Sequence, residues 1–123
     1  NFSNCFFNIY WQSILHGAII MTTKADGVDL SATTAANVGQ AGSSGGSYSV
    51  TITNRSSSDV TVRLGLGTSS ATFQDARYLL YDEPLAAKTS LTFSPVVAEA
   101  NDYIIAYSSA SSVNAIMMGF DEA

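Results

Sequence analysis

The chain is very poor in the side chains that most enzymes use for nucleophilic or metal chemistry. Its 123 residues include one cysteine, Cys5, and one histidine, His16. One cysteine cannot form an internal disulfide, so packing and strand pairing must stabilise the fold. A lone histidine beside aromatic residues is more often packed or solvated than catalytic. We therefore predict that the protein is not an enzyme and has no catalytic residues, no metal site and no cofactor.

Charge is scarce as well. Charged residues make up 12% of the chain, and ten acidic side chains against five basic ones give a formal net charge of −5. No lysine or arginine run is present that could displace counterions from a phosphate backbone, so we expect no nucleic-acid partner. An anionic membrane surface is disfavoured for the same reason. A hydrophobic content of 46% suits one globular domain whose polar surface comes mainly from Ser, Thr, Asn and Gly.

Residues 1–20 differ in composition from the rest of the chain. They carry no charge, yet they include Cys5, His16 and the single tryptophan, Trp11. Met21 then opens a stretch that reads like an ordinary protein start, so we interpret residues 1–20 as an upstream reading frame. Three alternatives stay open: an amphipathic helix that docks on a partner, a secretory signal, and a membrane anchor. A protein beginning at Met21 would contain neither histidine nor cysteine.

The clearest periodic signal covers residues 47–67. Apolar residues alternate there with small polar ones in two runs, and the first run has Tyr48, Val50 and Ile52 at its apolar positions. Alternation with period two is typical of a strand with one apolar and one solvated face. Residues 54–59, between the runs, are rich in Asn, Ser and Asp, which favour turns. We therefore predict a β-hairpin whose two strands are antiparallel neighbours.

The chain divides into three expected parts. Residues 1–20 are the leader or docking segment, residues 21–46 a polar N-terminal arm, and residues 47–123 the sandwich domain. Within the arm we expect a short strand at residues 28–30. A flexible Gly/Ser-rich arm or loop then follows over residues 33–46.

Four more short apolar runs follow the predicted hairpin, at residues 78–82, 91–94, 103–108 and 113–120. Pro84 and Pro95 are expected to end the first two, because proline cannot donate to a strand ladder. The 103–108 run is apolar on both faces, which favours a central strand or a second buried surface. We predict an all-β fold, a small antiparallel β-sandwich of jelly-roll or Ig-like type with about six to eight short strands, preceded by an N-terminal helix or a disordered leader. The predicted core residues are Val50, Ile52, Val62, Leu64, Leu80, Leu91, Phe93, Ile105 and Met117.

Carboxylates are the remaining candidates for acid–base chemistry. Asp82 and Glu83 are adjacent, so in an extended strand they point to opposite faces. A glycosidase could instead pair Asp82 with Asp102 or Glu99 across strands, but it would also need a deep cleft, which a small sandwich rarely supplies. Solvated strand ends are the favoured interpretation.

Two further motifs resemble ligand sites only superficially. The DGVD sequence of Asp26 to Asp29 offers oxygens to calcium, but it lacks the spacing of a calcium loop, so an Asp-Gly turn is favoured. The glycine-rich run at residues 39–46 lacks the Gly-Lys-Ser/Thr ending of a phosphate-binding loop. It leads into a strand instead of a helix, which favours a linker.

Tyrosines form the main candidate contact surface. Tyr78, Tyr81, Tyr103 and Tyr107 combine a large apolar ring with a polar tip, which suits sugar stacking or a protein contact. Alternation places Tyr78 and Tyr81 on opposite faces and Tyr103 and Tyr107 on one face. At least one ring should therefore be exposed. Core packing with the hydroxyls at the rim is the alternative interpretation.

From Met21 onward, the chain resembles a group of small virion proteins of tailed bacteriophages. The resemblance rests on five segments that keep the same order: VTITNR at residues 50–55, VTVRL at 60–64, YLLYD at 78–82 before LAA at 85–87, YIIAYSSA at 103–110, and GFDE at 119–122. In the similar proteins a clearer strand stands where residues 38–46 are Gly/Ser-rich here.

This resemblance implies a β-sandwich subunit displayed on a phage particle as a head decoration, fibre or tail component. It implies synthesis in the bacterial cytoplasm and localisation in the virion. The implied partners are other copies of the chain and phage capsid or tail proteins, with no catalytic residues to carry over. The alternative is a carbohydrate- or receptor-binding β-sandwich module that uses exposed tyrosines to bind a host surface glycan.

Overall fold

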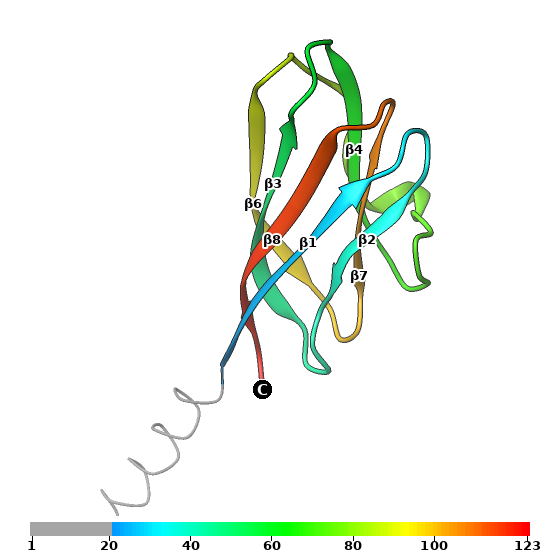
Figure 1. Cartoon of the computed structure of the whole chain (residues 1–123). Coiled ribbons are helices and arrows are strands. Elements are labelled where there is room, and N and C mark those ends of the chain that lie inside the picture. Colours follow the sequence, from blue (N-terminus) through cyan, green and yellow to red (C-terminus); the bar gives the residue numbers. More distant parts are fainter. Residues whose placement is uncertain (1–20) are drawn as a thin grey trace, which may run out of the picture.

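The computed structural model describes residues 21–123, which form eight strands and one short 3-10 helix (Figure 1). The elements are β1 (Thr22–Leu30), β2 (Ala36–Gln40), β3 (Gly46–Asn54), β4 (Val60–Gly67), η1 (Asp75–Arg77), β5 (Tyr78–Leu85), β6 (Ser90–Ala98), β7 (Tyr103–Ser108) and β8 (Val113–Asp121). The hypotheses about residues 1–20 lie outside the described residues. Within residues 21–123, no helix has the length and apolar character needed to cross a membrane.

The strands form two antiparallel four-stranded sheets. The first sheet has the order β1-β8-β3-β6 and the second has the order β2-β7-β4-β5. Every connection except the one between β4 and β5 passes from one sheet to the other, which is the wrapping of an eight-stranded jelly roll. The predicted small antiparallel β-sandwich is confirmed, and the strand order is that of the jelly-roll type.

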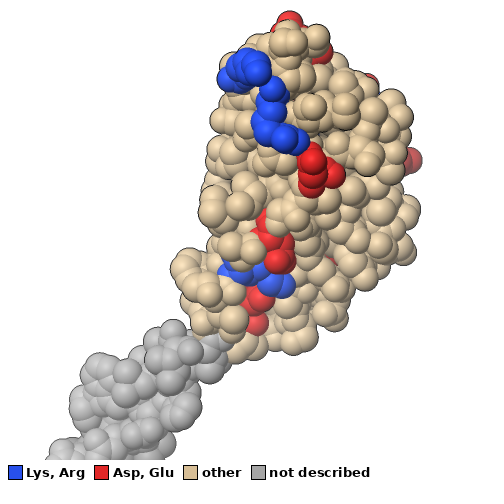
Figure 2. All heavy atoms as spheres, in the orientation of Figure 1, with Lys and Arg blue, Asp and Glu red and all other residues tan. Residues whose placement is uncertain are grey.

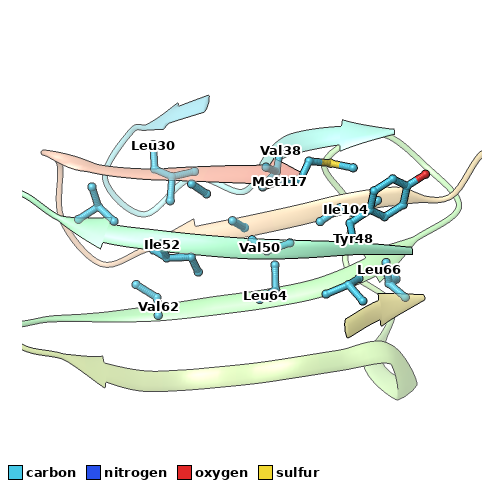
Figure 3. Close-up of a cluster of buried hydrophobic side chains, with 14 of the residues drawn as sticks. Leu30, Val38, Tyr48, Val50, Ile52, Val62, Leu64, Leu66, Ile104 and Met117 are labelled. Carbon is cyan, nitrogen blue, oxygen red and sulfur yellow. The ribbon is translucent and has the colours of Figure 1, made fainter. Parts of the chain in front are cut away.

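The core lies between the two sheets and is built from alternating apolar positions (Figure 3). Of the predicted core residues, five are fully buried between the sheets: Val50, Ile52, Val62, Leu64 and Met117. Ile105 is also fully buried, but it lies outside this core. Three others, Leu80, Leu91 and Phe93, are partly buried and pack against the core. Period-two alternation therefore identifies which side chains are shielded from water.

Residues 47–67 form two strands but not a hairpin, so that prediction is wrong. β3 lies in the first sheet between β8 and β6, whereas β4 lies in the second sheet between β7 and β5. Their apolar faces meet across the core, because alternation specifies the buried face of a strand and not its neighbour. Residues 55–59 connect β3 in the first sheet to β4 in the second. This connection is held by Asn54, whose fully buried side chain donates hydrogen bonds to the carbonyl oxygens of Ser58 (2.8 Å) and Leu85 (3.1 Å).

Residues 21–46, expected as a polar arm ahead of the sandwich, supply one strand to each sheet. β1 extends well beyond the short strand expected at residues 28–30 and pairs with β8 in an unbroken register. β2 occupies part of the loop expected at residues 33–46 and pairs with β7. Small residues serve close packing here, since a side chain at Gly39 would meet the sulfur of Met117. The expectation of a flexible loop over this whole segment is wrong for that reason.

Pro84 and Pro95 lie within strands β5 and β6 instead of ending them. Both strands are outermost in their sheets, so a residue without an N–H can be placed on the open side. The pairing register also shifts along each of these strands, which marks a β-bulge.

The outer face of the second sheet is partly covered by residues 68–77, which connect β4 to β5. Ile104 and Ala106 point into the core, so Ile105 between them lies on the outer face, and it is fully buried there. The Asn37 side chain on β2 makes hydrogen bonds of 2.7 and 2.8 Å to this connection. The sequence-based expectation for β7 is confirmed on both counts, because β7 is central in its sheet and has a second buried surface.

Candidate functional site

Three of the four predicted tyrosines gather on the outer face of the second sheet, beside Arg63 of β4. The Arg63 guanidinium lies 4.3 Å from the centroid of the Tyr81 ring and 4.7 Å from that of the Tyr107 ring. Tyr78 meets Tyr81 edge to face with ring centroids 4.9 Å apart, and Phe73 stacks on Tyr78 at 4.8 Å. We call these five residues the tyrosine cluster.

Tyr103 is the predicted tyrosine that lies apart from this cluster. It is half-buried at the start of β7, where it pairs with Gly67 of β4 and Gln40 of β2. Alternation along β7 puts it on the same face as Tyr107, as predicted, but at the other end of the strand.

The prediction that Tyr78 and Tyr81 lie on opposite faces of their strand is wrong. The single residue step from Leu64 to Gly65 of β4 is matched by two steps of β5, from Leu80 to Tyr78, so β5 carries an extra residue between the two tyrosines. A second register shift lies beside Tyr81, where Asp82 has a φ of 51°. An extra residue inverts the alternation that follows it, which brings both tyrosines to one face.

Asp82 also fixes the arginine at the centre of the cluster. Its carboxylate accepts hydrogen bonds from Nε (2.7 Å) and Nη2 (3.3 Å) of Arg63, and these bonds raise the pKa of the guanidinium. Tyr81 is 60% exposed, so one ring face remains open to solvent beside a fixed cation. Such a surface can stack against a sugar ring or another side chain.

Sequence reasoning missed Arg63 as a member of this surface. Alternation of β4 places Arg63 on the face opposite Val62 and Leu64, which are core residues. That signal was present in the sequence. What the sequence did not show was that β7 lies beside β4 with Tyr107 opposite Arg63, because strand pairing is a long-range property.

The outer face of the first sheet has a different character. Its outward positions, deduced from the registers, are Thr23, Ala25, Gly27 and Asp29 of β1; Asn114, Ile116, Met118 and Phe120 of β8; Ser47, Ser49, Thr51 and Thr53 of β3; and Ser90, Thr92, Ser94 and Val97 of β6. We call this set the hydroxyl face. Only Asp29 among these residues is charged, and hydroxyl pairs bridge β3 and β6 at 2.8 and 2.9 Å.

Three large apolar side chains stand exposed at one end of the hydroxyl face. Val97 is 67% exposed, Phe120 48% and Met118 47%. Ser47 is opposite both Phe120 and Val97, so the side chains of Phe120 and Val97 lie in one row across the sheet. Met118 belongs to the next row. In Figure 2, charged side chains on this side of the molecule gather in two groups, and most of the surface is uncharged.

The carboxylates weighed as a glycosidase pair are bound to different arginines. Asp102, in the turn before β7, is buried and accepts hydrogen bonds from Arg77 Nη2 (2.5 Å) and Nη1 (3.2 Å) and from the Glu99 N–H (2.9 Å). The bonds from Arg77 hold the pKa of Asp102 below its usual value. Asp82 is bound to Arg63 instead. Both carboxylates therefore have structural partners, and neither is presented as an acid or base.

Asp121 joins three segments at the end of β8. It accepts hydrogen bonds from the Tyr48 hydroxyl and from the Gly42 N–H (3.1 Å), and it lies 3.3 Å from the Lys24 ammonium. Burial acts to raise the pKa of Asp121, but the bonds from Tyr48 and Lys24 outweigh it and the net pKa is lowered. Burial and the neighbouring carboxylate raise the pKa of Tyr48.

The part of the chain described by the structure contains no pocket and no group of three or more His, Cys, Asp or Glu residues able to hold a metal. The residues weighed for calcium point to opposite faces of β1: Asp29 pairs with Arg55 at 2.5 Å, and Asp26 lies toward Gly39 of β2. The glycine-rich run at residues 39–46 leads into strand β3, as predicted, so it offers no helix N-terminus to a phosphate.

No protein-family model matches the chain, and no curated protein matches it in sequence. Among solved structures, a pentameric capsid protein isolated from metagenomic phage sequences is similar with a TM-score of 0.44 and 14% identity, over 81% of this chain and 63% of that one. A structure of the T13 IBDV viral particle has a TM-score of 0.47 and 5% identity, over 84% of this chain and 31% of that one. The IMPa metallopeptidase from Pseudomonas aeruginosa has a TM-score of 0.43 and 14% identity, over 82% of this chain and 12% of that one.

The chain thus spans less than two thirds of the length of these proteins. Structural virion proteins and a metallopeptidase occur together among them. Similarity of this kind does not assign a function to the chain.

Proposed function

We propose that the protein is a non-enzymatic structural subunit of a phage particle, a head decoration, fibre or tail component, that acts by packing against other copies and against capsid or tail proteins. The observation that carries this proposal is the hydroxyl face: a four-stranded surface with a single charged residue, in a chain of net charge −5.

The chemistry of this face suits contact with protein. Charged residues are depleted at the centres of protein interfaces, while aromatic residues and methionine are enriched. Phe120 and Met118 supply those side chains, and the surrounding hydroxyls can donate and accept hydrogen bonds with little desolvation of charge. Each exposed apolar side chain would lose contact with water on assembly, which favours association.

The resemblance to virion proteins of tailed phages supports the particle as the place where this contact is made. Two of its segments, residues 103–110 and 119–122, include strand β7 and the end of strand β8, the second strand of each sheet. Synthesis in the bacterial cytoplasm and incorporation into virions follow from that class.

Mass spectrometry of purified particles tests the proposal, with the peptide spanning β8 as the marker. We expect the chain in particles at a stoichiometry of many copies. A sharper version compares Phe120→Ser with Tyr81→Ser, since both remove an exposed aromatic ring but from opposite sheets. Phe120→Ser should reduce incorporation and Tyr81→Ser should not. Absence of the wild-type chain from particles would contradict the proposal.

A second candidate function is favoured by one specific observation, the open ring of Tyr81 beside the fixed Arg63 cation. This arrangement supports a carbohydrate- or receptor-binding module that contacts a host surface glycan. A glycan array decides it: binding that is lost in Tyr81→Ala and Tyr107→Ala but kept in Phe120→Ser would establish the module. Silence across the array would leave the tyrosine cluster as a structural feature of the fold.

A further inference from the structure

The two sheets have four outermost strands, and three of them are interrupted. β5 contains Pro84 and register shifts, β6 contains Pro95 and a register shift, and β2 is five residues long with a shift of its own. β1 is different: its nine residues pair with β8 without a break, and it contains no proline. Prolines, bulges, short length and charged side chains all hinder an edge strand from pairing with another chain. Only β1, among the described outermost strands, has neither a proline nor a bulge nor a short length, although it carries Lys24, Asp26 and Asp29.

The backbone groups that β1 leaves unpaired can be identified from the register. Two backbone hydrogen bonds, from the Glu122 N–H to the Gly45 carbonyl oxygen and from the Arg55 N–H to the Ser112 carbonyl oxygen, show that even-numbered residues of β8 bond toward β3. Odd-numbered residues of β8 therefore bond toward β1, where their partners are even-numbered. The odd-numbered residues of β1 are left with N–H and C=O groups directed away from the sheet. These residues are Thr23, Ala25, Gly27 and Asp29.

A second copy of β1 can pair antiparallel with this edge in few registers. Odd-numbered residues must lie opposite odd-numbered residues, because both strands direct those groups outward. Centring the pair on Lys24 would put two lysines opposite each other, and centring it on Asp26 would oppose two aspartates. Centring it on Ala25 places Lys24 opposite Asp26 of the second copy, and the two-fold axis repeats that pair. Charge complementarity thus selects one register.

The outward side chains agree with this register. Ala25 would lie opposite Ala25 of the second copy, and Thr23 opposite Gly27, so the strands approach without a clash of large side chains. Met118 is the neighbour of Ala25 on β8. The hydroxyl faces of the two copies would therefore join into one continuous surface with Met118 on both sides of the seam.

We propose that β1 is the contact edge between two copies of this chain, paired antiparallel about a two-fold axis at Ala25. The pairing turns two four-stranded sheets into one eight-stranded sheet. This inference rests on the proposed function, in which many copies of the chain lie close together on a particle. In the dimer, the pairs between Lys24 of one copy and Asp26 of the other determine which strand pairs with β1 and in which register.

The oligomeric state of the full chain tests this contact. Sedimentation would be measured from about 1 µM to about 1 mM, which spans weak to moderate dissociation constants. We expect a reversible dimer. Ala25→Pro removes one outward N–H and should raise the dissociation constant at least about tenfold. Ala25→Ser keeps that N–H and should leave the dissociation constant unchanged. A monomer at every concentration, or a dimer that Ala25→Pro does not weaken, would overturn the proposal.

A charge-exchange experiment tests the register itself. Asp26→Lys alone would oppose lysines at both pairs, and Lys24→Asp alone would oppose aspartates, so each variant should be monomeric. An equimolar mixture restores two Lys–Asp pairs and should form a mixed dimer. Circular dichroism confirms that each variant folds, since Lys24 also pairs with Asp121. Failure of the mixture to associate while both variants are folded would exclude this register.

The outcome is separable from that of the proposed function. If the chain is found in particles but Ala25→Pro does not change the dissociation constant of the dimer, the virion role is supported and the β1 contact is contradicted. If the chain dimerises through β1 but is absent from particles, the β1 contact is supported and the virion role is contradicted.

Discussion

The two sheets of the molecule have the same inner pattern and very different outer faces. The second sheet is partly covered by its own chain, through residues 68–77, and its remaining surface carries the tyrosine cluster with a fixed cation. The first sheet is covered by no segment of this kind within residues 21–123, and its outer face is uncharged apart from Asp29. The second sheet is therefore partly covered within one chain, whereas the uncovered first sheet is the surface that we propose for contact with another molecule.

The largest expected effect concerns the cover of the second sheet. Asp102→Ala would leave the Arg77 guanidinium without its carboxylate and the Glu99 N–H without its acceptor. Breaking a buried ion pair by removing one partner costs about 3–5 kcal/mol, so we expect a loss in the free energy of unfolding near the lower end of that range because Arg77 is partly exposed. Urea denaturation measures it. Asp75→Ala, on the exposed η1 helix, is the control and should change stability by less than about 0.5 kcal/mol.

The next effect compares the two outer faces directly. Ile105 of β7 is fully buried on the outer face of the second sheet, and Ile116 of β8 is half-buried on the hydroxyl face. Ile105→Ala should cost about 2–4 kcal/mol of unfolding free energy because it creates a cavity under the cover. Ile116→Ala should cost about 1 kcal/mol because solvent can fill the space. Equal losses in denaturation would mean that the two faces are equally covered.

Acid should destabilise the fold through one carboxyl on each sheet. Asp102 and Asp121 both have a pKa lowered in the folded state, the first by hydrogen bonds from Arg77. The stabilisation from such groups is present above the unfolded carboxyl pKa of about 3.9 and is lost as the pH falls through the folded pKa. The loss should be smaller than that of Asp102→Ala, because a protonated carboxyl still accepts hydrogen bonds. Denaturation midpoints over a pH series measure it, and Asp102→Asn should flatten the acid limb, whereas an unchanged limb would contradict the assignment.

The smallest expected effect on stability is at the exposed aromatic rings. Phe120→Ser and Tyr81→Ser each remove a ring that is about half in water, so each should change the unfolding free energy by less than about 1 kcal/mol. Thermal unfolding of the isolated chain checks this. A large loss for Phe120→Ser would show that the ring packs within one chain, which would weaken the case for an intermolecular surface.

The sequence predicted burial far better than it predicted pairing. Alternation identified Val50, Ile52, Val62 and Leu64 as core residues, because period two is a local property of a strand. It did not reveal that β3 and β4 lie in different sheets, since the same pattern suits strands that lie side by side and strands that face each other. Strand neighbours in a jelly roll are set by contacts between distant segments.

The candidate site was predicted in part for the same reason. Three of the tyrosines do share a surface, but a bulge between Tyr78 and Tyr81 reversed the expected side of one of them, and an extra residue leaves no mark in the apolar pattern. The hydroxyl face follows from the alternation of β3, which the sequence shows plainly. Its extent across four strands required the registers of β1, β6 and β8.

The most direct test is a cryo-electron-microscopy map of particles that contain the chain. The account predicts that the hydroxyl face, with Phe120 and Met118, is buried against neighbouring subunits, while Tyr81 on the second sheet faces solvent. A map in which the hydroxyl face lies open to solvent and the tyrosine cluster forms the contact would contradict it.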